Sequence, residues 1–62
     1  MTEDQVALGG AMMMLRRHGE HAPLRVAERI GKLAAAGDWD GVCCWKAIGA
    51  HMDQILRPGH IQ

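Results

Sequence analysis

The chain has 62 residues, 48% of them hydrophobic, with seven basic and seven acidic side chains and a formal net charge of zero. A domain of this size buries only about 60% of its unfolded surface, and a disulfide, a metal or a partner subunit often supports such a core. A duplex DNA binder usually has a basic excess, which this chain lacks. The apolar run 6–15 is about half as long as a membrane span, and no export signal is visible, so we expect a cytoplasmic protein.

The first predicted helix covers residues 3–18. Thr2 and Gln5 have the spacing of a capping box, and Gly19 suits a helix end. The body of this helix is apolar on every side, whereas a surface helix normally has one polar face. Three short helices offer little cover for such an element, so we expect it to contact a second chain.

Two glycines, Gly9 and Gly10, interrupt this helix. Each lowers helix stability by about 1 kcal/mol relative to alanine. Either a close approach of another helix or a kink would account for them. The sequence leaves both open.

The second and third predicted helices cover 23–36 and 39–56. Pro23 suits a first helical turn, Gly37 suits a helix end, and Asp38 suits the cap of the helix that follows. The apolar arc predicted for the third helix consists of Val42, Trp45, Ile48, Gly49, Met52, Ile55 and Leu56.

Short connections favour packing between neighbouring helices. We therefore expect one all-α, three-helix domain over 1–62, with 57–62 as a loose tail. Two arrangements fit: a compact bundle, or a helical hairpin completed by dimerisation.

Surplus apolar side chains point to an association surface. Trp39 lies off the apolar arc of its helix, so it either forms part of that surface or folds back as a lid over the core. Unbranched methionines adapt to irregular packing, which suits core and interface positions alike. The candidate interface residues are Leu8, Met12, Met13, Met14 and Trp39.

Four side chains raise the question of metal binding or catalysis: Cys43, Cys44, His18 and His21. Adjacent helical cysteines point about 100° apart, so they do not converge on one metal or form an unstrained disulfide. His18 and His21 straddle a helix end, and His51 and His60 are isolated in the sequence. We expect no metal site, no cofactor and no catalytic residue, and read the thiols as reduced.

DNA binding is the alternative function. The second and third helices have the lengths of a helix-turn-helix pair. However, the third begins with acidic and apolar residues where base-reading side chains would stand, and Arg25, Arg29 and Lys32 lie on the second helix instead.

An ordered set of residues resembles a family of very short alphaproteobacterial proteins known only as a domain of unknown function. The resemblance covers residues 18–56; in members of that family the first helix carries an aromatic residue, where this chain has Gly9, Gly10 and three methionines. It implies a small helical protein and brings no activity, cofactor or catalytic residue. The matching residues are His18-Gly19, Ala22, Ala27-Glu28-Arg29-Ile30, Leu33, Gly37-Asp38, Gly41-Val42, Trp45-Lys46-Ala47-Ile48 and Asp53-Gln54.

These observations favour a non-enzymatic protein–protein interaction module. Its expected partner is a second copy of the chain, forming a homodimer, or another protein of unknown identity. The alternative is a small DNA-associated regulator of the helix-turn-helix type.

Overall fold

The computed structural model describes residues 2–57, and almost all of them are helical. Helix α1 spans Glu3–His18, α2 spans Ala22–Ala35 and α3 spans Trp39–Leu56, while a single 3-10 turn, η1 (Gly19–His21), joins α1 to α2. The expected bounds agree with these to within one residue. The described part of the chain has no strand, which confirms the all-α class. Of the expected loose tail, everything after Arg57 lies outside the described residues.

Side-chain caps begin α1 and α3. Thr2 Oγ1 accepts a hydrogen bond from the Gln5 backbone N–H, and Gln5 Oε1 accepts one from the Thr2 N–H, both at 3.1 Å. At the start of α3, Asp38 Oδ1 accepts from the Gly41 N–H at 3.0 Å. Because these bonds satisfy amide groups that have no partner within the helix, they set where each helix begins.

The turn between α2 and α3 is a Schellman motif. Gly37 has a φ of 75°, and its N–H donates to Ala34 O at 3.0 Å. The Asp38 N–H donates to Leu33 O at 2.9 Å. Glycine adopts this left-handed conformation without strain, so Gly37 ends α2 while Asp38 caps α3. The chain reverses direction over the three residues 36–38.

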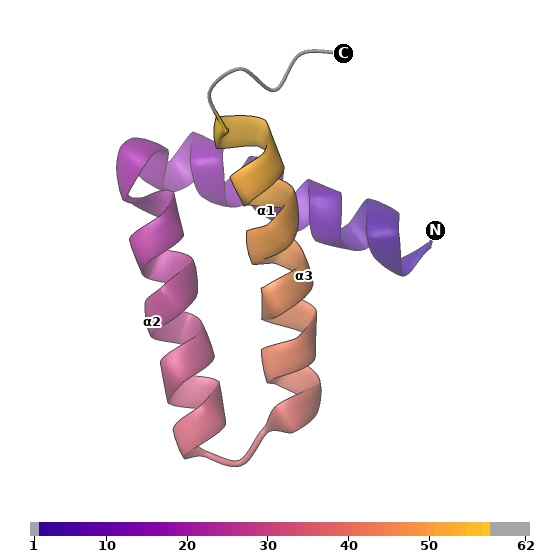
Figure 1. The fold of residues 1–62 in the computed structure, drawn as a ribbon, viewed down its shortest axis with the longest axis vertical. Coiled ribbons are helices and arrows are strands. Elements are labelled where there is room, and N and C mark those ends of the chain that lie inside the picture. The colour runs from indigo at the N-terminus through magenta and orange to yellow at the C-terminus, as the bar shows by residue number, and fades with distance from the viewer. Residues whose placement is uncertain (1, 58–62) are drawn as a thin grey trace.

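The three helices form a compact bundle within one chain. In Figure 1, α2 and α3 lie side by side as an antiparallel hairpin, and α1 crosses α3 near the end of the hairpin away from the Gly37 turn. Helix α3 packs against both α2 and α1, whereas α1 and α2 touch little beyond their connection. Of the two expected arrangements, the structure has the bundle.

The core is small and contains few large side chains. A cluster of Ala11, Ala22, Val26 and Met52 is buried, and Met52 is its one large fully buried side chain in residues 2–57. The partly buried side chains that pack against this cluster are Met14, Leu15, Ile30, Trp45 and Ile48. Alanines at the crossing of α1 let the helices approach closely, which leaves little interior volume.

The expected apolar arc of α3 extends too far along the helix. Val42 and Met52 are buried, and Trp45, Ile48 and Gly49 are half-buried, but Ile55 and Leu56 are exposed. Figure 1 shows the last turn of α3 extending past α1, so less of the bundle covers it. The periodicity of apolar residues identified the correct side of the helix, but not the position beyond which that side is no longer buried.

Candidate functional site

The side of α1 that faces away from α3 carries large apolar side chains. Val6 and Met13 are 52% and 57% exposed, and Met12 is exposed beside them. Gly9 lies between these three on the helix surface, given about 100° per residue. We call Val6, Gly9, Met12 and Met13 the outward face of α1. It is the candidate site, because exposed apolar groups gathered on one element mark contact surfaces.

The three consecutive methionines divide between this face and the core. Met12 and Met13 are exposed, whereas Met14 is half-buried and packs against the core cluster. Successive helical positions point about 100° apart, so one methionine run supplies both interior and surface. Among the predicted interface residues, Leu8, Met12, Met13 and Trp39 are therefore accessible and Met14 belongs to the packing of the monomer.

The two glycines of α1 have different surroundings. A Cβ atom added at Gly10 would lie 3.0 Å from Ile48 Cδ1, so α3 approaches Gly10 closely. A Cβ atom added at Gly9 would meet nothing within 4 Å. Of the two explanations that the sequence left open, close approach of a helix applies to Gly10. Contacts within residues 2–57 give no reason for glycine at position 9.

Charge is distributed unevenly along α1. Its last turn contains Arg16, Arg17 and His18, and the two arginines line a shallow hollow together with Met13. Its first turn contains Asp4, whose carboxylate lies 3.3 Å from His51 Nε2 on α3 and remains largely exposed. One end of the helix is acidic and the other is basic, an arrangement that also suits the helix dipole.

Trp39 lies at the surface. As the first residue of α3 it follows directly on the Gly37 turn, and the residue is 66% exposed. The sequence left Trp39 either as a lid over the core or as part of the surface, and the structure places it at the surface. Leu24, on α2, is as exposed as Met13, and neither Leu24 nor Val6 was among the predicted interface residues. A helical wheel places Leu24 away from the apolar arc of α2, which was a usable signal, whereas the all-apolar α1 gave none for Val6.

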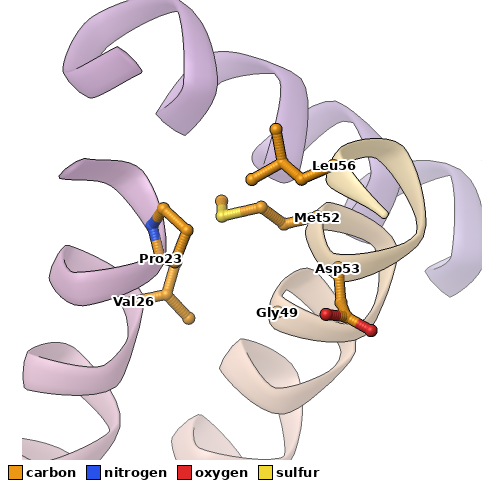
Figure 2. A pocket seen from close by; sticks show the side chains of 6 residues that line it. All are labelled: Pro23, Val26, Gly49, Met52, Asp53 and Leu56. Atoms are coloured by element: carbon orange, nitrogen blue, oxygen red, sulfur yellow. The ribbon is translucent and has the colours of Figure 1, made fainter. Parts of the chain in front are cut away.

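A small apolar hollow opens between α2 and α3. Figure 2 shows Pro23 and Val26 of α2 facing Met52 and Leu56 of α3. Gly49 and Asp53 complete the lining of a space of about 130 Å³. The Asp53 carboxylate accepts a hydrogen bond from Arg57 at 2.9 Å. Ligand pockets usually measure about 300 Å³ or more, so this space fits one apolar side chain rather than a cofactor.

The thiols and the junction histidines do not come together. Cys43 and Cys44 are exposed and free, and they line a hollow with Ala7, Asp40 and Ala47. His18 and His21 adjoin the α1–α2 connection, which Figure 1 shows at the opposite end of the hairpin from the start of α3. Within residues 2–57, no three or more His, Cys, Asp or Glu side chains are grouped to hold a metal. His60 lies outside the described residues.

Two of the three basic residues of α2, Arg25 and Arg29, are engaged within the chain. Arg25 forms an ion pair with Glu28 at 3.2 Å, and the Arg29 guanidinium lies 5.7 Å from the centre of the Trp45 ring. Helices α2 and α3 run antiparallel (Figure 1), whereas the two helices of a helix-turn-helix cross at about 90–120°.

Comparisons with known proteins place the chain in a family without assigning an activity. No helix within residues 2–57 is long and apolar enough to cross a membrane. No curated protein and no solved structure matches the chain. A family model does match, and its match reaches further than the resemblance over 18–56, because it includes α1. That model, described as a family of unknown function (DUF6961), covers residues 3–58, and the chain belongs to this family.

Proposed function

We propose that this protein is a non-enzymatic protein–protein interaction module whose contact surface is the outward face of α1. One observation carries the proposal: Val6, Met12 and Met13 remain exposed on one side of a helix whose other side is buried. Burying apolar surface against a partner is favourable by about 25 cal/mol per Å². These side chains therefore provide binding energy that the monomer does not use.

The composition of this face suits a partner rather than water alone. Methionine side chains are flexible and polarisable, so they adapt to the shape of an opposing surface. The arginines beside Met13 add the polar rim that is typical of interfaces. The antiparallel α2–α3 pair gives no comparable support to the alternative of a helix-turn-helix DNA regulator.

The partner is a second copy of the chain or another protein, and both belong to the proposal. A cytoplasmic location is also part of it, because the adjacent thiols of Cys43 and Cys44 are free, as is usual in a reducing compartment. Exposed Trp39 is proposed as a second, smaller contact, since tryptophan is enriched among the residues that dominate binding energy.

Chemical cross-linking of the full chain in its own cell tests the function. Wild type is compared with Met13→Asp, which places a charge on the outward face. Leu24→Asp is the matched control, because Leu24 on α2 has the same exposed fraction of 57% as Met13. We expect wild type and Leu24→Asp to give the same cross-linked partner band, and Met13→Asp to lose it. A Met13→Asp variant that keeps every wild-type cross-link would overturn the proposed contact surface.

A further inference from the structure

We infer that the outward face of α1 binds a second copy of itself, with the two α1 helices antiparallel and their two-fold axis on the Gly9 side of the helix, midway along it between the levels of Gly9 and Gly10. This inference rests on the proposed function and names the partner of the same surface. Three properties of α1 carry it: a glycine that the monomer does not need, opposite charges at the two ends, and a hollow that faces an apolar side chain after the two-fold rotation.

Gly9 is the first argument. It lies in the middle of α1 and on its outward face, where a methyl group would meet nothing within 4 Å. Glycine in a helix interior is unfavourable, and Gly9, unlike Gly31 of α2, stands among exposed large apolar side chains where a second helix could pack. Where two helices cross, glycine lets their backbones approach closely. The outward face has this feature at its centre, with Val6 and Met13 on one side of it and Met12 on the other.

Charge complementarity selects the partner and the orientation. The first turn of α1 contains Asp4, whose exposed carboxylate lies on the α3 side of the helix beside His51, and its last turn contains Arg16 and Arg17. An antiparallel pair places the acidic end of each helix beside the basic end of the other, and the two helix dipoles also oppose each other favourably. A parallel pair would place like charges together at both ends. A second copy supplies this complementary pattern without any other partner.

The shape of the outward face also fits an antiparallel pair. A two-fold axis midway between the levels of Gly9 and Gly10 puts position 6 of one copy opposite position 13 of the other. Val6 therefore faces the shallow hollow that Met13, Arg16 and Arg17 line in the second copy. The aliphatic parts of both arginines cover apolar surface while their guanidinium groups stay in water. The contact then has an apolar centre and charged edges.

The size of the contact predicts a modest affinity. A helix of 16 residues is about 24 Å long. One helix pair of this length lies at the lower limit for a specific interface, which is about 1,000 Å² of total buried surface. We therefore expect micromolar rather than nanomolar dissociation, with monomer and dimer in rapid exchange.

Sedimentation of the full chain from about 1 µM to 1 mM provides the test. We expect wild type to shift from monomer to dimer and Met13→Asp to remain monomeric. Gly9→Ala should weaken dimerisation by about tenfold or more while raising the Tm of the dilute monomer by roughly 2–8 °C. Gly31→Ala is the matched control, because Gly31 on α2 also has nothing within 4 Å of an added Cβ. It should raise the Tm and leave dimerisation unchanged.

Cross-linking tests the orientation. In a Cys43→Ser/Cys44→Ser background, a Val6→Cys chain is mixed with a Met13→Cys chain and treated with a short bismaleimide. An antiparallel pair gives mainly the mixed 6-to-13 product. Predominant 6-to-6 and 13-to-13 products would contradict it, and circular dichroism of each variant verifies that it is folded.

The outcomes separate this inference from the proposed function. Wild type that stays monomeric at 1 mM overturns self-pairing, as does a dimer that Gly9→Ala leaves equally tight. In either case, loss of a cross-linked cellular partner in Met13→Asp would still support the interaction module. A dimer in solution that Met13→Asp leaves intact overturns self-pairing through this face, and the proposed contact surface is overturned as well if Met13→Asp also keeps every cellular cross-link.

Discussion

On α1, small apolar side chains are buried and larger apolar side chains are exposed, which is the reverse of the usual pattern. The side that faces α3 is built on Ala7 and Ala11, both buried, while the outward side carries Val6 and Met13 in water. Small side chains are what a close helix crossing requires, so the larger apolar groups lie where there is no neighbour. Hydrophobic side chains are thus not by themselves a sign of the interior. Here, the exposed ones identify the candidate surface.

The largest expected effect comes from comparing a buried methionine of the core, Met52, with an exposed one on the outward face, Met12. Met52→Ala removes the one large side chain that is fully buried among residues 2–57 and should lower the free energy of unfolding by about 2–5 kcal/mol. Met12→Ala, on the outward face, should change it by less than about 0.5 kcal/mol. Urea unfolding of dilute protein measures both. Equal losses would mean that the outward face of α1 is packed as tightly as the core around Met52.

Two alanines test whether the crossing depends on small side chains. Ala11→Leu forces extra volume into the contact between α1 and the core and should lower the free energy of unfolding by about 1–3 kcal/mol. Ala27→Leu makes the same change at an exposed position on α2 and should be close to neutral. Thermal unfolding compares them. A neutral Ala11→Leu would show that the crossing accommodates larger groups.

Gly9 and Gly10 allow the outward side and the α3 side of α1 to be compared at neighbouring positions. Gly9→Ala should raise the free energy of unfolding of the monomer by about 0.5–1 kcal/mol, because alanine favours the helix and meets no neighbour. Gly10→Ala should gain less than this, since its methyl group must displace Ile48. Denaturation below the concentration at which dimers form gives the difference. A larger gain at position 10 would contradict the close approach of α3.

The smallest expected effect is that of a charge on the outward face. Met13→Asp should change the free energy of unfolding of the monomer by no more than about 0.5 kcal/mol, because the side chain is already in water. We expect this substitution to weaken dimerisation instead. Unfolding curves and sedimentation on the same sample separate the two, and a strongly destabilised monomer would show that Met13 has a structural role.

The ends of the helices were predictable from sequence because local chemistry sets them. The Thr2 capping box, the Asp38 cap and the Gly37 turn each act within a few residues, and each is present as predicted. The start of α2 differs by one residue, since the η1 turn leads directly into Ala22. A short 3-10 turn leaves little trace in a pattern of apolar residues.

The arrangement of the helices was harder to predict. Periodicity gives each helix a buried side, but α1 is apolar all round and so offers no direction for packing. The contact of Gly10 with Ile48, 38 positions along the chain by their numbers, depends on the whole fold. The division of Met12, Met13 and Met14 between surface and core follows from that same packing, so the candidate interface was only partly predictable.

The packing of both other helices on α3 has a consequence for the order of folding. Because α3 follows α1 and α2 in the chain, a ribosome releases two helices before the one on which they pack. Isolated helices of this length are marginal in water. The Asp4–His51 contact joins positions 47 residues apart, so it closes only once nearly all of α3 has emerged. We therefore expect α1 and α2 to gain most of their stability only once α3 is available, and we expect unfolding to be one cooperative transition.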